Sequence, residues 1–216
     1  MIRLDQVVKQ YSRRGETVTA LSCPQLEIED GAYVAIIGPS GSGKTTLLSL
    51  LGGMLSPSQG RVWIDNTSVY DLSVAARSAL RSQRLGFVFQ TFNLIPYLTA
   101  LQNVQIPLAL NGTDPREQEV LARLMLKRFG LNERLNHKPS ELSVGQQQRV
   151  ALARTLVNDP AIILADEPTG NLDSRTTDDV LTMFETLHEQ EGITIMLVTH
   201  ESDVGNRAKR IVRLRD

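Results

Sequence analysis

The sequence predicts an α/β fold: a parallel-sheet core with a small antiparallel β part and an inserted α-helical part. Three observations support this prediction. Four near-continuous apolar runs have the composition of strands in a parallel sheet that is covered on both faces, at residues 33–37, 85–89, 161–165 and 193–199. Apolar and polar residues alternate near the N-terminus, as in antiparallel strands with one exposed face. The stretch from residue 91 to about residue 158 has the periodicity and capping residues of helices.

The antiparallel part is expected in two segments, residues 1–30 and about 58–70. Alternation at residues 2–5 and 25–28 predicts two of its strands, and residues 61–65 predict a third after a turn rich in Ser, Pro and Gly. These strands are expected to form a small sheet beside the first apolar run.

The first apolar run leads into a glycine-rich loop and then into a second apolar segment at residues 47–51. The loop has the full pattern G-x-x-x-x-G-K-[ST] and consists of Gly38, Pro39, Ser40, Gly41, Ser42, Gly43, Lys44 and Thr45, with Thr46 next. In a strand–loop–helix unit of this kind, backbone N–H groups and the helix N-terminus bind phosphate oxygens, and the lysine supplies a cation. The alternative is an ordinary tight turn. The complete pattern predicts a nucleoside triphosphate site, with Thr45 placed to bind magnesium.

Polar side chains follow the other apolar runs where the strands end: Gln90, then Asp166 and Glu167, then His200. Because ligands of a parallel sheet bind beyond the carboxyl ends of its strands, these residues are expected to meet around one nucleotide. Asp166 can then hold magnesium together with Thr45, and Glu167 can polarise the attacking water. Gln90 can orient that water or complete the metal shell. His200 can bind the terminal phosphate and fix Glu167.

Each of these four residues also has an ordinary structural interpretation. Asp166 could cap a turn or helix, and Glu167 could be a solvated surface carboxylate. Gln90 alone is a common loop residue, and His200 alone is most simply a histidine with satisfied hydrogen bonds at a strand end. The four strand ends considered together favour the functional interpretation.

The helical part contains two recognisable helices. Asp114 and Pro115 predict the start of the first, whose apolar positions include Val120, Leu121, Leu124 and Phe129, and which Gly130 ends. The second begins at Ser143, which forms a capping-box pattern with Gln146, and its buried stripe is predicted at Val150, Ala153, Leu156 and Val157. A helix N-terminus with a serine and Gly145 is also an anion site. The sequence therefore predicts a second anion site besides the glycine-rich loop.

Composition excludes several classes of protein. With 23 basic and 24 acidic residues the net charge is −1, so bulk charge does not indicate nucleic-acid binding. Cys23 is the only cysteine, which excludes an internal disulfide and suits a reducing compartment. No targeting segment is recognised, and the apolar stretches are far shorter than the roughly 20 residues of a membrane helix, so a membrane role would require a partner. Basic residues near the C-terminus interleave with Ile211, Val212 and Leu214, which predicts a terminal strand with a solvated basic face.

In this order, the motifs resemble those of the ATP-binding subunit of an ABC transporter, over essentially the whole chain. The resemblance assigns Walker A to residues 38–45, the Q-loop to Gln90, the signature to residues 142–146, Walker B to residues 162–166 with the catalytic Glu167, the D-loop to residues 170–173 and the switch histidine to His200. Tyr11 falls where the family places an aromatic residue that stacks on adenine. The short stretches at residues 50–53, 146–149 and 165–173 are similar to those of one branch of the family, which includes the lipoprotein-releasing (LolD-like), macrolide-exporter (MacB-like) and cell-division proteins.

The resemblance implies a P-loop NTPase (RecA-like) core in about residues 31–57, 71–90 and 159–216, with ATP and Mg²⁺ as its ligands. It also implies a head-to-tail homodimer with two ATP molecules sandwiched between the subunits. The signature residues of one subunit then complete the other subunit's site, and they are Ser143, Gly145 and Gln146.

A membrane partner is the second implication of the resemblance. The chain would be an ATP hydrolase that powers an integral membrane permease, for export or for lipoprotein, lipid or peptide extrusion. It would lie peripherally on the cytoplasmic face of the inner (plasma) membrane. The permease is expected to dock near residues 90–98, where the candidate groove residues are Phe92, Leu94, Ile95, Pro96, Tyr97 and Leu98. Ordinary packing between the core and the helical part is the alternative for each of them.

One position departs from the family pattern. The signature is usually Leu-Ser-Gly-Gly-Gln, and here Val144 stands in place of the first glycine. If this position is the first helical residue, valine costs only a few tenths of a kcal/mol in helix propensity. We expect this mild outcome because Ser143 and Gly145, the residues expected to face phosphate, are intact.

Three other functions remain as alternatives. An ABC-type ATPase that acts on DNA would carry a long coiled coil between its two halves, whereas only about 100 residues separate Lys44 from Ser143. A generic P-loop kinase would leave Ser143, Gly145 and His200 unexplained. An ATP-gated regulatory scaffold for a membrane-bound cell-division or cell-wall partner, without substrate transport, is compatible with the sequence.

Overall fold

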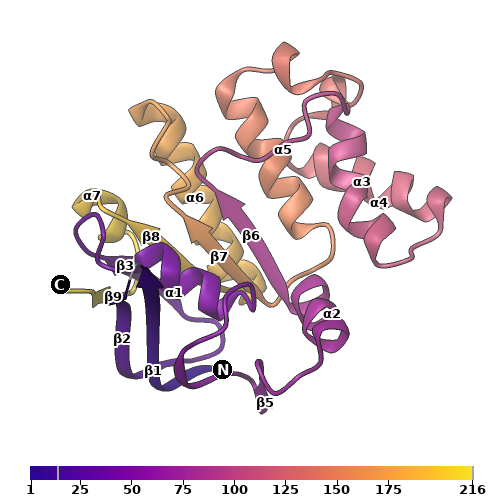
Figure 1. Cartoon of the computed structure of the whole chain (residues 1–216). Coiled ribbons are helices and arrows are strands. Elements are labelled where there is room, and N and C mark those ends of the chain that lie inside the picture. Colours follow the sequence, from indigo (N-terminus) through magenta and orange to yellow (C-terminus); the bar gives the residue numbers. More distant parts are fainter. Residues whose placement is uncertain (14, 216) are drawn as a thin grey trace.

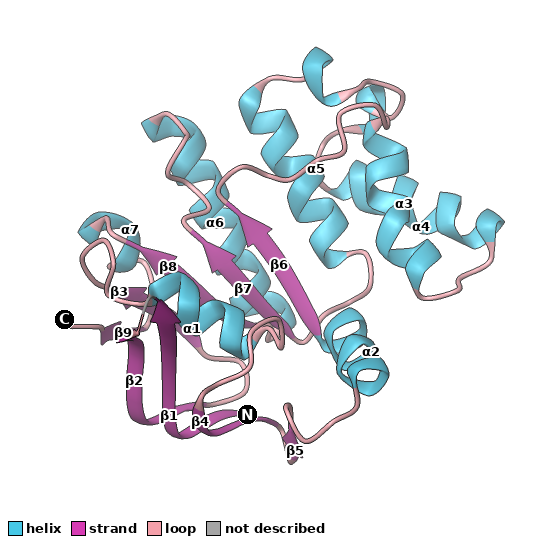
Figure 2. Cartoon of the chain, in the orientation of Figure 1, coloured by secondary structure: helices cyan, strands magenta, loops and turns pink. Residues whose placement is uncertain are grey.

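The computed structural model describes the chain except for Arg14 and Asp216, and of Arg13 it describes the backbone alone. The described chain contains two β-sheets with helices around them (Figure 1). The helices in the middle of the sequence gather on one side of the molecule, and the two sheets lie on the other (Figure 2). Within the described residues, none of the helices is both long and apolar enough to cross a membrane.

The larger sheet is parallel and has the strand order β6-β7-β8-β3-β9. Its strands are β3 (Tyr33–Ile37), β6 (Leu85–Phe89), β7 (Ile162–Asp166), β8 (Thr194–Thr199) and β9 (Arg210–Arg213). The four predicted apolar runs are therefore the four neighbouring strands β6, β7, β8 and β3. The predicted terminal strand is also confirmed, because β9 pairs with β3 at the edge of the sheet.

The smaller sheet is antiparallel and has the order β2-β1-β4-β5. Its strands are β1 (Ile2–Arg13), β2 (Glu16–Ile28), β4 (Gln59–Ile64) and β5 (Thr67–Ser68). The predicted antiparallel sheet is thus present, with longer first and second strands than the alternating segments indicated.

Side chains on the two faces of the parallel sheet belong to two separate hydrophobic cores. In β7, Ile163 and Ala165 pack in one core, whereas Ile162 and Leu164 pack in the other. Successive side chains of a strand point to opposite faces, so a strand that is buried on both faces must be apolar throughout. This explains why these segments are uninterrupted apolar runs in the sequence.

Helices cover both faces of the parallel sheet. Helix α1 (Lys44–Leu51) contacts strands of both sheets, and Figure 1 shows it between them. Helix α6 (Ser174–Glu191) packs on β8 with Val180 and Phe184 buried. The other core helices are α2 (Val74–Arg84) and α7 (Ser202–Gly205). Helix α1 therefore anchors the glycine-rich loop between two sheets.

The inserted part contains three helices that contact one another. They are α3 (Ala100–Leu110), α4 (Pro115–Arg128) and α5 (Val144–Leu156), with short 3₁₀ turns η1 (Asn132–Arg134) and η2 (Pro139–Glu141) between the last two. We call residues 100–156 the helical subdomain. The predicted buried stripe of α5 is confirmed, because Val150, Ala153, Leu156 and Val157 are all buried.

The predicted apolar face of α4 is wrong in part. Its start at Pro115, with Asp114 as the N-cap, is confirmed. However, Val120 and Leu124 are exposed, and the helix instead buries Ala122 and Leu126. The apolar side of the helix packs mainly on α3 and α5, and its buried strip is narrow.

Candidate functional site

The glycine-rich loop joins β3 to α1 and is held in a conformation that requires glycine. Gly43 has φ +88°, and a Cβ atom there would lie 2.4 Å from the carbonyl oxygen of Ala20 in β2. A side chain is therefore excluded both by the backbone conformation and by the neighbouring strand. The loop therefore packs directly against β2 at the start of α1.

Lys44 is buried beneath this loop, with 6% of its surface exposed. Its Nζ donates to the carbonyl oxygens of Gly38 and Pro39, at 2.8 and 2.7 Å. An ammonium group has three N–H donors, so two carbonyls hold it in place while one donor remains for an anion. The positive charge and the N-terminus of α1 together favour a phosphate group at this position.

A cavity of about 290 Å³ lies over the glycine-rich loop. Its lining consists of Ala20, Ser40, Gly41, Gly43, Lys44, Thr45, Thr46 and Glu167. The described lining does not include Tyr11. Tyr11 lies on β1 opposite Val18, is 47% exposed, and has the Lys9 ammonium 5.1 Å from its ring centroid. The predicted adenine-stacking role of Tyr11 stays a prediction.

Thr45 and Asp166 lie next to each other at the ends of two different elements. The Oγ1 of Thr45 is 3.5 Å from Oδ1 of Asp166, which it contacts as a donor. Burial raises the pKa of Asp166 above its ordinary value, and the charge of Glu167 acts in the same direction, while the Thr45 hydrogen bond and Lys44 oppose them. Burial therefore disfavours the charged form of the Asp166 carboxylate, and a cation bound beside it would stabilise that form.

This pair fits magnesium. Mg²⁺ prefers oxygen ligands and binds through one or two carboxylates together with phosphate oxygens and water. The described residues contain no cluster of three or more His, Cys, Asp or Glu side chains that could hold a metal by itself. Thr45 and Asp166 would therefore hold the ion next to the phosphate groups, where it would neutralise their charge.

Glu167 follows β7 in a left-handed conformation, with φ +44°. Such a conformation costs a non-glycine residue on the order of 1 kcal/mol or more, and it persists only where the surroundings fix it. Its N–H donates to the Val198 carbonyl at 2.9 Å, and its carbonyl accepts from Gly170 at 3.1 Å. The strained backbone turns the Glu167 side chain into the lining of the cavity over the glycine-rich loop.

His200 contacts the carboxylate of Glu167. Its Nδ1 lies 3.0 Å from Oε1 of Glu167. An ionised carboxylate only accepts hydrogen bonds, so Nδ1 is the donor and Nε2 is the ring atom that can contact a ligand. The expected proximity of these two strand ends is thus observed.

Gln90 lies at the end of β6, the neighbouring strand of β7. A Cβ atom on Gly170 would lie 2.9 Å from its Nε2, so the side chain packs closely on this glycine. The Gln90 carbonyl accepts from Asn171 Nδ2 at 3.2 Å. Gln90 is therefore held against the segment that follows Glu167.

The second predicted anion site is the N-terminus of α5. The capping box is confirmed: Ser143 Oγ accepts from the Gln146 N–H, and Gln146 Oε1 accepts from the Ser143 N–H. Val144 is the first helical residue and is 49% exposed. A Cβ atom on Gly145 would lie 3.0 Å from Cγ2 of Thr176 in the first turn of α6. Ser143, Gly145 and Gln146 are not among the described residues that line the cavity over the glycine-rich loop.

One buried residue in this region was not predicted. Gln148 is completely buried in α5, and its Nε2 donates to the Pro168 carbonyl at 3.0 Å. Pro168 directly follows Glu167. In the sequence Gln148 is the last of three consecutive glutamines, and only its position on the helix distinguishes it from Gln146 and Gln147.

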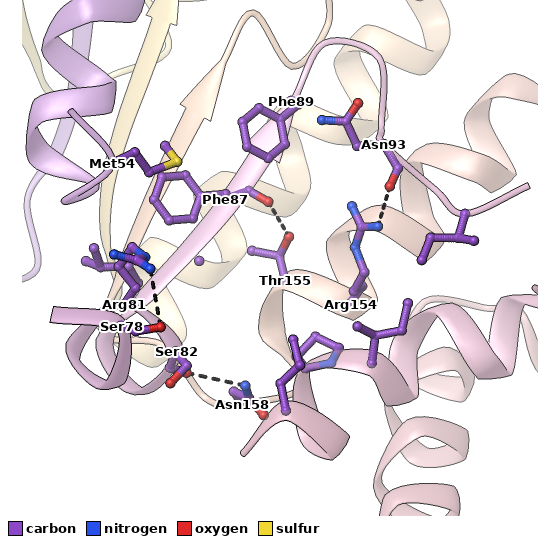
Figure 3. Close-up of a pocket in the computed structure, with 16 residues that line it drawn as sticks. Met54, Ser78, Arg81, Ser82, Phe87, Phe89, Asn93, Arg154, Thr155 and Asn158 are labelled. Carbon is purple, nitrogen blue, oxygen red and sulfur yellow. Dashed lines mark hydrogen bonds between the residues drawn. The ribbon is translucent and has the colours of Figure 1, made fainter. Parts of the chain in front are cut away.

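A groove of about 530 Å³ separates the core from the helical subdomain (Figure 3). Phe87 and Phe89 of β6 form one wall, and Arg154 of α5 lies opposite. Arg154 donates to the carbonyls of Phe92 and Asn93, at 2.7 and 2.6 Å. Both of these residues have positive φ, so the arginine holds the segment after Gln90 in a strained shape.

Comparisons with known proteins identify the family to which the chain belongs. The ABC transporter family model matches residues 21–170. The macrolide export ATP-binding/permease protein MacB of Syntrophobacter fumaroxidans is 48% identical, over 100% of this chain and 30% of that protein. The uncharacterized ABC transporter ATP-binding protein MJ0796 of Methanocaldococcus jannaschii is 46% identical, over 100% of this chain and 94% of that protein. The chain thus spans less than a third of the length of its MacB relative.

Solved structures give the same result. A dimeric post-hydrolysis state of the ATP-binding cassette MJ0796, bound to ADP and Pi, has a TM-score of 0.91 and 43% identity, over 100% of this chain and 94% of that chain. The predicted P-loop NTPase fold is therefore confirmed. With a family model that matches more than half of its length and relatives of this similarity, the chain belongs to the ABC transporter family as one of its ATP-binding cassettes.

Proposed function

We propose that this protein is an ATP-binding and ATP-hydrolysing subunit that dimerises on ATP and powers a membrane-embedded permease. The observation that carries the proposal is that the two predicted anion sites, the glycine-rich loop and the N-terminus of α5, do not line one cavity. The described lining of the cavity over the glycine-rich loop includes Lys44 and Glu167 but not Ser143 or Gly145. A second copy of the chain, arranged head to tail, supplies its Ser143, Gly145 and Gln146 to the ATP held by the first copy.

The predicted site residues have defined roles in this proposal. Lys44 and the loop N–H groups bind the phosphates of ATP, and Tyr11 stacks on adenine. Thr45, Asp166 and Gln90 hold Mg²⁺ directly or through water. Glu167 accepts a proton from the water that attacks the terminal phosphate, and His200 orients Glu167 and contacts that phosphate.

The relatives support the dimer and the membrane partner. MJ0796 is described as a dimeric ABC transporter cassette in two solved structures, at 43% and 44% identity to this chain. MacB is named as an ATP-binding and permease protein for macrolide export. By analogy, this chain powers export by a permease and is peripheral on the cytoplasmic face of the inner membrane.

The groove between the core and the helical subdomain supports a docking site for that permease. Its lining combines large apolar side chains, among them Phe87, Phe89 and Ile95, with Arg81 and Arg154. Among the described lining residues there is no Asp or Glu. Ile95 belongs to the predicted docking region, residues 90–98, whereas Phe92 of that region is buried and packs inside the protein. We propose that an apolar helix of the permease enters this groove.

Replacing the proposed base tests the proposed function. Glu167→Gln should lower the ATP turnover number by about two to four orders of magnitude, because an amide cannot accept the proton. The same variant should retain ATP binding, since the phosphate contacts are unchanged. It should also form a persistent ATP-dependent dimer, detected by light scattering after size exclusion.

A matched control is Glu201→Gln, one residue beyond His200. This glutamate is exposed and follows the same strand, so its substitution should leave turnover within about twofold of the unmodified protein. Equal turnover in Glu167→Gln and the unmodified protein, or the absence of an ATP-dependent dimer, would contradict the proposal.

A further inference from the structure

Gln148 connects the helix that begins with the signature to the loop that carries Glu167. It lies in the second turn of α5 and is completely buried. Its Nε2 donates to the Pro168 carbonyl at 3.0 Å, a contact between residues 20 positions apart. This buried hydrogen bond links α5 to the loop that follows Glu167.

The chemistry of this contact fixes the orientation of the Gln148 amide. The Pro168 carbonyl can only accept a hydrogen bond, so the amide nitrogen of Gln148 must face it. Within the described chain the other amide atom, Oε1, is buried without a hydrogen-bond partner. Burying Oε1 without a partner costs free energy, whereas Nε2 of the same side chain holds the loop.

The loop needs support at this point. Glu167 has φ +44°, a conformation that its own side chain disfavours. Its N–H is held by Val198 and its carbonyl by Gly170, which fixes the Glu167 peptide from the strand side and from within the loop. Gln148 holds the next carbonyl, that of Pro168, from the opposite side. The position of the Glu167 carboxylate therefore depends on α5 as well as on the sheet.

Helix α5 is itself fixed against the same region of the core. Gly145, one turn earlier, packs against Thr176 so closely that a Cβ atom would lie 3.0 Å from the threonine methyl. Thr176 donates through its N–H and its Oγ1 to the carboxylate of Asp173, the N-cap of α6. The start of α5, the start of α6 and the loop after Glu167 thus form one packed unit.

We infer that Gln148 is a positioning residue for ATP hydrolysis, which holds the backbone after Glu167 so that the carboxylate reaches the attacking water. This inference rests on the proposed function, because it requires Glu167 to be the base. Gln148 contacts neither the glycine-rich loop cavity nor, through its buried side chain, a second subunit. Its effect is therefore on the rate of the chemical step and not on the binding of ATP.

The test is the substitution Gln148→Met, which keeps the length and volume of the side chain and removes the donor. We expect kcat to fall by roughly tenfold to a hundredfold, the size of effect that a displacement of about 1 Å at a reacting group produces. The KM for ATP should change by less than about twofold. Combined with Glu167→Gln, the substitution should leave the ATP-dependent dimer intact.

Gln147→Met is the matched control. Gln147 is the neighbouring residue on α5, and its Nε2 donates to the Leu142 carbonyl at 3.1 Å, within the same helix end. It loses the same type of hydrogen bond without affecting the loop after Glu167, so kcat should stay within about twofold. Thermal unfolding of both variants checks that they fold equally well. If Gln148→Met does not fold, Gln148→Asn, which keeps the amide but shortens its reach, gives the same comparison.

Three outcomes would overturn the inference: an unchanged kcat in Gln148→Met, an equal loss in Gln147→Met, or loss of the ATP-dependent dimer in the double variant. The last result would mean that the substitution displaces α5. The proposed function fails separately, when Glu167→Gln itself retains full turnover.

Discussion

Two helix N-termini in this chain are suited to bind phosphate, and they are built in opposite ways. Helix α1 begins at Gly43, which makes no side-chain capping hydrogen bond in the described structure, and Lys44 is buried beneath it. Helix α5 begins at Ser143 with a complete capping box, and its first residue, Val144, is half exposed. The first N-terminus therefore leaves its N–H groups for a ligand, whereas the second is partly satisfied by its own side chains.

This difference indicates where the ligand of each N-terminus would come from. The glycine-rich loop at the start of α1, the α1 site, packs against β2 and holds the Lys44 ammonium, so a single chain supplies both N–H groups and a cation for an anion. In the described structure the N-terminus of α5, the α5 site, is capped by its own side chains and exposed at Val144, and the N–H groups of its first two residues stay available. In the proposed dimer, this exposed N-terminus would meet a ligand that another subunit brings.

The largest effect should follow from removing the cation of the α1 site. Lys44→Ala removes the charged donor, so the Kd for ATP should rise by roughly tenfold to a hundredfold and turnover should be lost. Isothermal titration of the separate subunit with ATP measures this. Lys127→Ala, an exposed lysine on α4, is the control and should leave binding unchanged. Unchanged ATP affinity in Lys44→Ala would show that the two sites do not differ as described.

A smaller and different effect should follow from Ser143→Ala. The separate subunit should keep its ATP affinity, because Ser143 lies outside the α1 site. In the Glu167→Gln background, the ATP-dependent dimer should dissociate at least about tenfold more readily, since each of its two ATP sites loses one hydrogen bond to phosphate. Analytical ultracentrifugation with ATP measures this.

The chain offers a matched control for that substitution. Ser73 is the N-cap of α2 and accepts from the Ala76 N–H at 3.2 Å, so Ser73→Ala removes a capping bond of the same kind. Both variants should lose about 1 kcal/mol of stability. Only Ser143→Ala should weaken the dimer. An equal effect of both substitutions would show that Ser143 acts only as a helix cap and does not contact ATP.

The smallest effect should follow from Val144→Gly, which restores the usual family signature. Because Val144 is the first helical residue and exposed, the ATPase rate should change by less than about tenfold, roughly 1.4 kcal/mol. Val74 is likewise the first residue of α2 after a serine cap and is 74% exposed, so Val74→Gly controls for helix stability. A larger change in Val144→Gly alone would show that the valine itself tunes the α5 site.

The sequence was sufficient to predict the strand ends that form the site. A strand buried on both faces must be apolar throughout, so a polar residue directly after it, such as Gln90 or Asp166, is conspicuous. The capping box at Ser143 was predicted for a similar reason, because it is a local pattern. The same pattern at Thr99 and Gln102 begins α3, and it could have located that helix.

Other features depend on tertiary packing and could not be predicted in this way. Helix α2 has no fully buried residue, and its apolar side packs on the core through the partly buried Leu80, so the burial that would single it out is small. The buried face of α4 is set by its packing on α3 and α5, which covers Ala122 and Leu126 and leaves Val120 and Leu124 exposed. Gln148 differs from the adjacent glutamines only in the direction of its side chain, which follows from the packing of α5 on the core.

Helix α5 contributes to three places described above. Its N-terminus carries the capping box and the predicted anion site, its second turn holds the Pro168 carbonyl, and Arg154 near its end holds the carbonyls beside the groove. At about 1.5 Å per residue, its 13 residues form a rod about 20 Å long. A rigid helix of this length transmits a tilt, so a rotation at its first turn must displace its last turn beside the groove.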